Sequence, residues 1–277
     1  MKKIIKILSI IFCIIIMIFS ISGCSKQKTD EEQLKDKNMS EIDYLDNYIM
    51  LMLNSINDID LKQYDAKLEK TENLNELSEE NEETSSQDIG NNVVQYSMVP
   101  NMILNSNGEI NWANLKLQIE NLNNIWPSII VDLYKANVEN TKLTEFSDLI
   151  NICLGYIKNE NRVETLNNLY KLYEYIPIYL EKIVNDEKQL AVSRTKVDVI
   201  HAYINTDFEN WDDIKANLDS AIKNFEPVIN NTEESEKDYN ISKAYVLLQE
   251  FRNAVDTHDK DLLLIKYKNL MEELIIL

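Results

Sequence analysis

Apolar residues recur along this chain in alternating steps of three and four, the spacing that places them on one face of an α-helix. The first such stripe is Ile42, Leu45, Ile49, Met52, Ile56 and Ile59. Ser40 stands just before it with Asp43 three residues later, a pattern typical of a helix N-terminus. We therefore predict a helix that begins near Ser40.

Two later helices are predicted to open with the same residue pair, Asn111-Trp112 and Asn210-Trp211. The apolar positions that follow take identical steps: Leu115, Ile119, Leu122, Trp126 and Ile129 after the first pair, and Ile214, Leu218, Ala221, Phe225 and Val228 after the second. A short polar side chain can accept the first free backbone N–H groups of a helix, so both asparagines are predicted N-caps. Both tryptophans, with Trp126 and Phe225, are predicted to anchor the core.

Two prolines occupy matching places in this pattern. Pro127 and Pro227 each follow the second aromatic anchor by one or two residues. Proline removes a helical hydrogen bond, so we expect each helix to break or kink there. Pro177 is expected to kink the chain later in the same way.

Two further pairs of stripes match in order along the chain. Leu143, Phe146, Ile150, Cys153 and Ile157 take the same steps as Ile241, Ala244, Leu248, Phe251 and Val255. Leu166, Leu169, Leu172, Tyr173 and Ile176 correspond to Leu264, Tyr267, Leu270, Met271 and Leu274. A stripe at Leu190, Val197, Ile200 and Ile204 would correspond to the helix from Ser40. The match predicts an internal duplication into two units, residues 40–183 and 184–277.

The predicted fold class is all-α, with two duplicated antiparallel helical bundles, heptad-like packing and no sheet. The chain has only four glycines and four prolines, which leaves few residues for tight turns. Residues 69–92 are acidic, rich in Ser and Asn, and nearly free of large apolar residues. We predict that they form a disordered insert within the first unit.

The N-terminus has the three-part layout of an export signal. Three lysines precede an apolar run over residues 7–21, and the small residues Ser22 and Gly23 then lead to Cys24. The apolar run is short for a membrane span. Residues 1–23 are therefore the expected signal peptide, and the polar residues 24–39 are the expected flexible tether.

The stretch Ile21-Ser22-Gly23-Cys24 resembles the lipobox of bacterial lipoproteins. The resemblance implies cleavage before Cys24 and lipidation of that cysteine, and two acyl chains are enough for stable anchoring. It thus implies a protein held on the cell membrane and facing the extracellular side. The alternative is an uncleaved N-terminal anchor helix, which also places the rest of the chain outside.

The repeated unit resembles a Firmicute family of membrane-anchored helical proteins of unknown function. The matching residues are Asn111, Trp112, Trp126, Ile176 and Pro177 in the first unit, and Asn210, Trp211 and Phe225 in the second. The resemblance implies helical architecture and membrane placement. It implies no chemistry, because the family has no assigned activity.

The charge of the chain limits the classes of molecule that it can bind. The net charge is −19, and removal of the three signal lysines makes it −22. Such a surface repels nucleic acid and anionic lipid headgroups, so we predict no nucleic-acid binding. It is compatible with cationic partners.

Candidate reactive residues are few. His201 and His258 are the two histidines, and neither belongs to a zinc-binding pair, so no metal or cofactor is predicted. Cys153 occupies a stripe position and is predicted to be a buried packing residue. The segment 256–261 carries three aspartates without the glycine of a calcium loop, and is predicted to be a turn that caps the next helix.

Four tyrosines gather at 170, 173, 175 and 179. Tyr173 follows the core stripe, whereas Tyr175 should point elsewhere. Exposed tyrosines can form a partner surface, and the alternative is a partly buried helix edge.

These observations predict a non-enzymatic interaction or scaffold module of the cell envelope that docks another envelope protein. The alternative is a helical solute-, peptide- or metal-binding lipoprotein. An envelope hydrolase would need an acid pair or metal site, which no motif in the sequence specifies.

Overall fold

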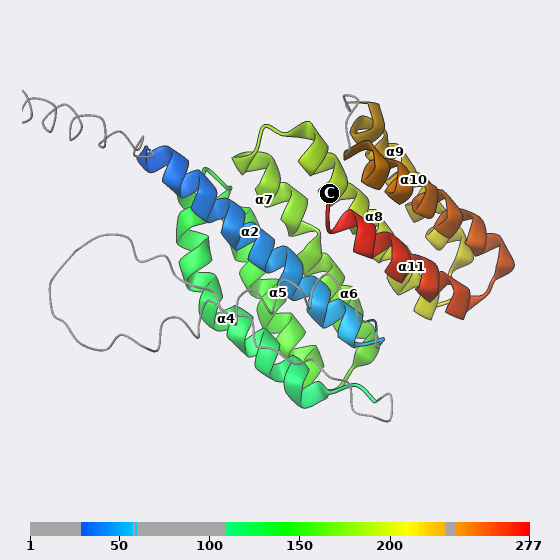
Figure 1. Ribbon diagram of the computed structural model, residues 1–277. Helices are drawn as coiled ribbons and strands as arrows, with labels where there is room; N and C mark the ends of the chain where they lie inside the picture. Colours follow the sequence, from blue (N-terminus) through cyan, green and yellow to red (C-terminus); the bar gives the residue numbers. More distant parts are fainter. Residues whose placement is uncertain (1–28, 58, 60–108, 231–236) are drawn as a thin grey trace, which may run out of the picture. The chain divides into compact units, whose positions relative to one another are not determined.

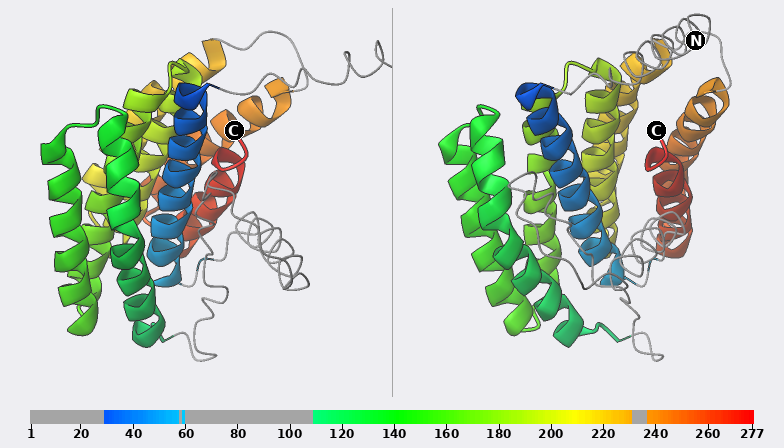
Figure 2. Two further views of the ribbon diagram at one scale, coloured as in Figure 1. Left: turned by 90° about the vertical axis from the view of Figure 1, so that its left-hand side faces the viewer. Right: turned by 60° about the vertical axis from the view of Figure 1, so that its left-hand side comes forward.

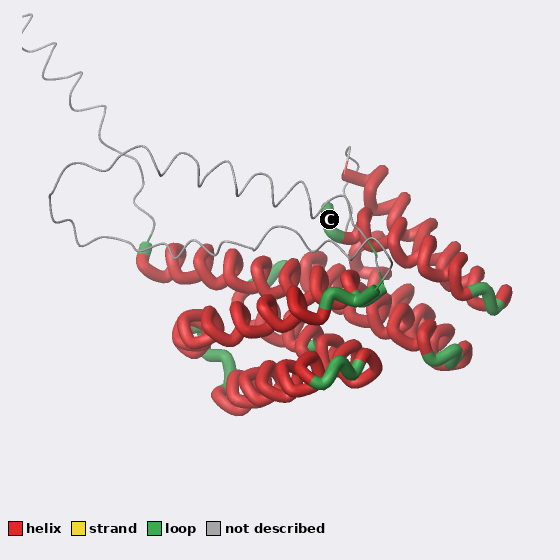
Figure 3. The backbone as a smooth tube through the Cα atoms, turned by 90° about the horizontal axis from the view of Figure 1, so that it is seen from below, coloured by secondary structure: helices red, strands yellow, loops and turns green. Residues whose placement is uncertain are grey.

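The computed structural model describes residues 29–57, 59, 109–230 and 237–277. Within these ranges the fold is all-α, and helices, turns and loops make up the whole trace in Figure 3. The helices are α2 (Asp30–Ser55), α4 (Trp112–Lys135), α5 (Asn140–Lys158), α6 (Arg162–Tyr173), α7 (Tyr175–Ile183), α8 (Glu187–Asp207), α9 (Trp211–Asn230), α10 (Lys237–Ala254) and α11 (Lys260–Leu274), with a 3₁₀ turn η1 (Val255–Thr257), as Figure 1 shows. The predicted all-α class is confirmed for these residues. The predicted signal peptide, Cys24 and the predicted insert over 69–92 lie outside the described residues.

Nearly every stripe position predicted from the sequence is buried. The α4 stripe from Leu115 to Ile129 and the α9 stripe from Ile214 to Val228 are at most 4% exposed. The α5 and α10 stripes are buried as well. Leu264 is an exception, because it is only partly buried while its neighbour Leu263 is fully buried.

Helix α2 begins ten residues earlier than predicted, so the expected tether over 24–39 is helical from Asp30 onward. The Thr29 hydroxyl accepts a hydrogen bond from the Glu32 N–H at 3.2 Å, and the Glu32 carboxylate accepts one from the Thr29 N–H at 2.9 Å. This reciprocal pair is a capping box, which satisfies two backbone donors at the helix start. Ser40 therefore lies inside the helix and is not its N-cap.

We predicted a break or a kink at the prolines of α4 and α9, and the break does not occur. Helix α4 continues through Pro127 to Lys135, and α9 continues through Pro227 to Asn230. Pro127 is exposed, and so are Asn123 and Lys223, four residues before each proline. Water can therefore reach the carbonyl groups that lose their helical partners. At Pro177 the chain does change helix, because α6 ends at Tyr173 and α7 begins at Tyr175.

Residues Lys37–Leu277 form one compact unit, and the chain before Lys37 is a separate unit. A single hydrophobic cluster within Lys37–Leu277 contains residues from both sides of position 184. The two bundles predicted from the sequence therefore share one core.

Helices α2 and α8 run parallel and in register in the middle of this core. Three contacts join residues separated by 150 positions: Asp46 with Lys196, Leu53 with Tyr203, and Asn57 with Asp207. Figure 2 shows α2, in blue, between the green helices α4 and α5 and the red helix α11. Both α2 and α8 are buried on more than one face.

The backbone repeats its local geometry in the two halves. The Trp112 N–H donates to the Ile110 carbonyl at 3.0 Å, and the Trp211 N–H donates to the Glu209 carbonyl at 3.1 Å. Glu160 and His258 both have φ of 52°, and each precedes a residue whose side chain caps the next helix. These recurrences agree with a duplication, which stays a prediction.

Candidate functional site

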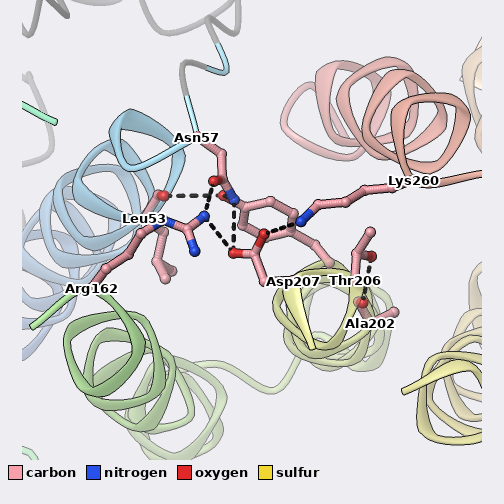
Figure 4. A network of polar contacts seen from close by, with 8 residues as sticks. Leu53, Asn57, Arg162, Ala202, Thr206, Asp207 and Lys260 are labelled. Atoms are coloured by element: carbon pink, nitrogen blue, oxygen red, sulfur yellow. Dashed lines mark hydrogen bonds and ion pairs between the residues drawn. The ribbon is translucent and has the colours of Figure 1, made fainter. Parts of the chain in front are cut away.

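The largest polar cluster described lies where α2, α6, α8 and α11 meet, and Asp207 is at its centre (Figure 4). One carboxylate oxygen of Asp207 contacts the Arg162 guanidinium at 2.6 Å, and the other contacts the Lys260 ammonium at 2.9 Å. Asn57 adds a bond to the first oxygen at 3.3 Å and another to the Tyr203 hydroxyl at 2.7 Å. Arg162 also donates to the Asn57 side chain.

This cluster is a cross-link between helices. The Asp207 side chain is only 4% exposed, and cations occupy both of its oxygens. Arg162, Asn57 and Lys260 thus take up three of the roughly four acceptor positions of this buried carboxylate. Its contacts tie the end of α2 to the second half of the chain.

A second cross-link lies along the same helices. Asp46 of α2 accepts a hydrogen bond from the Tyr173 hydroxyl of α6 at 2.5 Å, and its other oxygen contacts the Lys196 ammonium of α8 at 2.8 Å. Lys196 is 11% exposed at its side chain, so this ion pair is largely removed from water. Asp46 thus joins α2 to Tyr173 in the first half of the chain and to Lys196 in the second half.

A third cross-link joins α2 to α4. Asp132 contacts the Lys37 ammonium at 2.5 Å and the Lys135 ammonium at 2.9 Å. Burial alone raises the pKa of the Asp132 carboxyl, but the hydrogen bonds from the two lysines outweigh burial and hold that pKa below its usual value.

A fourth polar cluster lies between α6, α8 and α9 and is built mainly on hydrogen bonds. One oxygen of Asp198 accepts hydrogen bonds from the Ser220 hydroxyl at 2.8 Å and the Asn224 amide at 2.7 Å. Burial raises the pKa of Asp198, and the two donors together with the charge of His201 only partly offset that effect. One turn later, the His201 ring stacks on Tyr170 at 4.3 Å between ring centroids.

The predicted N-cap is confirmed at Asn111, whose side chain accepts the Asn114 N–H at 3.0 Å. At Asn210 the side chain instead donates to the Asp213 carboxylate. The difference follows from the third helical residue, because Asp213 offers a charged acceptor where the first half has Asn114. Asn210 thus precedes α9 without the predicted side-chain cap.

Two of the four predicted aromatic anchors lie in the core, and the other two pack against its edge. Trp126 and Phe225 are buried, and the Trp126 indole donates to the Ser147 hydroxyl at 2.6 Å. Trp112 and Trp211 are the first residues of α4 and α9, and both are partly buried against the core. These residues support the packing and are not gathered into one site.

The other residues singled out from the sequence, Cys153, the four tyrosines and Asp259, lie among packing and capping contacts. Cys153 is a free, fully buried thiol, and burial raises its pKa to about 12. Tyr173 and Tyr179 are fully buried, whereas Tyr170 and Tyr175 are partly buried. Asp259 accepts the Leu262 N–H at 3.0 Å and so caps α11, as predicted for this turn.

Sequence reasoning missed the acidic cross-links, although two of them carry a visible signal. Asp132 lies three residues after the stripe residue Ile129, and Asp207 lies three residues after Ile204. Each acid thus extends a buried stripe by one helical step, which should have predicted a buried carboxylate with a partner. The partners themselves come from distant segments.

Within the described ranges, no group of three or more acidic, histidine or cysteine side chains could hold a metal ion. The helices searched there include none that is both long and apolar enough to cross a membrane. No protein-family model, curated protein or solved structure matches this chain. The lipobox and Firmicute resemblances stay predictions.

Proposed function

We propose that this protein is a lipid-anchored module on the outer side of the cell membrane whose helical body docks another envelope protein. The observation that carries the proposal is the N-terminal order of three lysines, an apolar run and Ser22-Gly23-Cys24. An export signal needs a basic start followed by an apolar run, and lipid attachment needs small residues before a cysteine. The duplication into two related helical units is part of the proposal.

The helical body supports a docking role. Ion-paired cross-links at Asp46, Asp132 and Asp207 fix the helices around a shared core, so their outer faces form a preorganised surface. A preorganised surface loses little conformational entropy when a partner binds. The net charge of −19 favours a partner with a basic contact surface.

Metabolic labelling with an alkyne fatty acid tests the anchor in a bacterial host. The wild-type chain should incorporate the label, and Cys24→Ala should not. Cys13→Ala and Cys153→Ala are matched controls that remove the other two cysteines and should keep the label. Label retained in Cys24→Ala, or absent from the wild type, would overturn lipidation at this residue.

Site-specific photo-cross-linking tests the docking role in intact membranes. A photoreactive residue at Tyr134 or Tyr239, which are 63% and 71% exposed, samples the two halves of the chain. The same residue at the fully buried Phe146 is the control. One discrete adduct from an exposed position supports docking, and no adduct at any exposed position of the described helices contradicts it.

A further inference from the structure

Helix α4 carries a second stripe on the face that points away from the core. The positions of this stripe alternate steps of four and three, and we call them the outer α4 stripe: Ala113, Leu117, Glu120, Asn124, Pro127, Val131 and Tyr134. Its three large apolar side chains, Leu117, Val131 and Tyr134, are exposed. Such steps over three heptads are the pattern by which two helices pair in a coiled coil.

The outer α4 stripe is poor in acids, although the chain is rich in them. Glu120 is its one acidic residue, and the Lys116 ammonium lies 3.9 Å from that carboxylate. The net charge of −19 makes two copies of the chain repel each other. Along this stripe, two copies can therefore meet with little local repulsion.

The matching face of α9 is acidic and gives an internal comparison. The residues 99 positions after the first six members of the stripe (113 + 99 = 212) are all exposed: Asp212, Ala216, Asp219, Lys223, Glu226 and Asn230. Acids thus recur there every seven residues, at 212, 219 and 226. Like charges at such positions keep two helices apart. Of the two matching faces, α4 is therefore the one suited to pair with a copy of itself.

We propose that α4 pairs with α4 of a second copy of this chain, in a parallel two-fold contact along the outer α4 stripe. In such a pair Leu117, Asn124 and Val131 occupy equivalent heptad positions, and each meets the same residue of the other copy. A single asparagine at one of these positions fixes the register of the two helices. A β-branched residue such as Val131 at another favours two strands.

The parallel direction rests on the proposed anchor at Cys24. Lys37 of α2 contacts Asp132 near the end of α4, and the Tyr48 hydroxyl donates to the Gln118 carbonyl near its start, so α2 and α4 run antiparallel. Lys37 follows Cys24 by 13 residues (37 − 24 = 13), so the end of α4 is the end beside the anchored side of the chain. A parallel pair keeps both anchors on one side, as a single membrane requires.

The contact is small, so pairing depends on concentration. The stripe spans 22 residues (134 − 113 + 1 = 22). A helix of that length is about 33 Å long, and a face about 10 Å wide buries about 700 Å² over both copies, below the roughly 1,000 Å² of a stable interface. The facing Glu120 carboxylates weaken the pair further. Anchoring in one membrane raises the effective concentration of the copies and so favours a weak contact.

Cysteine cross-linking of the full chain in membranes of a bacterial host tests the contact. Leu117→Cys and Val131→Cys each bring a thiol against its own copy in a parallel pair, so mild oxidation should give a disulfide-linked band of twice the chain mass. Ala216→Cys and Asn230→Cys, at the matching exposed positions of α9, should give at least about tenfold less of this band. The wild-type chain, which keeps the buried Cys153, sets the background.

A charge placed on the outer α4 stripe tests the same contact in a second way. Val131→Glu, combined with Leu117→Cys, should lower the band at least about tenfold, because it sets two carboxylates against each other. Asn230→Glu with Leu117→Cys adds the same charge on α9 and should change the band less than about twofold. A normal thermal transition in each variant shows that a lost band is not lost folding.

Two results would overturn the proposal. Equal bands from the α4 and α9 positions would show random collisions between copies. No band from either Leu117→Cys or Val131→Cys would show that the outer α4 stripes do not meet in parallel.

The pairing and the proposed function fail separately. Normal fatty-acid labelling without an α4-specific band overturns the pairing alone. If labelling fails, sedimentation of the purified full chain in detergent micelles still tests the pairing, because a dimer that grows with concentration should be lost in Val131→Glu and kept in Asn230→Glu. A photo-cross-linked adduct at Tyr134 with twice the chain mass belongs to this contact, whereas an adduct of any other mass reports a docked partner.

Discussion

Asp207→Asn is expected to destabilise the folded chain more than neutralisation of an exposed acid such as Asp219. The carboxylate is 4% exposed and contacts Arg162 at 2.6 Å and Lys260 at 2.9 Å. Asparagine keeps the shape but removes the charge, and its amide nitrogen would face a cation. The change therefore leaves two cations without their shared partner.

The magnitude follows from how far each partner is exposed. Removing one member of a fully buried ion pair costs about 3–5 kcal/mol. The Arg162 and Lys260 side chains are 35% and 42% exposed, so water can solvate both cations once the carboxylate is gone. We therefore expect a loss of about 2–3 kcal/mol in the free energy of unfolding. For a chain of this size that corresponds to a fall of about 5–10 °C in Tm.

Urea denaturation followed by circular dichroism measures this loss. Asp219→Asn is the control, because Asp219 pairs with Arg252 at 2.8 Å but is 53% exposed. We expect that exposed pair to contribute less than about 0.5 kcal/mol. If Asp207→Asn also changes the free energy of unfolding by less than about 0.5 kcal/mol, the cluster is not a cross-link and the reasoning is wrong.

Other predictions concern conformation, charge and thiol access. Glu160→Gly should stabilise the protein by about 0.5–1 kcal/mol in thermal unfolding, because this exposed residue has φ of 52°, which glycine adopts without strain. Glu164→Gly, within α6, is the control and should destabilise by about 1 kcal/mol. Asp198→Asn should raise Tm at pH 7 and change it less at pH 3. The pKa of Asp198 is higher in the folded chain than in the unfolded chain, so protonation of this carboxyl favours folding at low pH. The ionised carboxylate disfavours folding once pH rises above the folded pKa, and asparagine removes that effect. An Asp198→Asn protein that is less stable than wild type at pH 7 would contradict this. Cys153 should react with a thiol reagent at pH 8 only after urea unfolding, since burial excludes the reagent and raises the thiol pKa to about 12; rapid labelling of the folded chain would show that the core is open there.

The apolar periodicity was enough to predict the fold class and most of the core. Steps of three and four identify which side chains face inward, and the five α4 stripe residues are all buried as the steps require: Leu115, Ile119, Leu122, Trp126 and Ile129. The cap at Asn111 was predictable because it depends on its nearest neighbours in sequence. The early start of α2 was missed because Thr29 and Glu32 lie in a polar stretch without a stripe.

The cross-links could not be paired from sequence. The chain has 47 acids and 28 basic residues, and nothing local selects Lys196 for Asp46 across 150 positions. The choice depends on how α2 and α8 align, which is a property of the whole fold. The contacts of Asp198 were missed for the same reason, because Ser220 and Asn224 reach it from another helix.

The parallel pairing of α2 with α8 has a consequence for the order of folding. Helix α2 is made early and finds its partners late: Leu53 contacts Tyr203, and Asn54 accepts a hydrogen bond from Tyr267, 213 residues away. During synthesis, α2 therefore emerges long before the segments that cover its apolar stripe. Contacts between residues this distant in sequence slow folding. Apolar surface that stays exposed until they form is prone to aggregation. A chain interrupted before α11 would lack the Tyr267 contact and leave α2 incompletely covered.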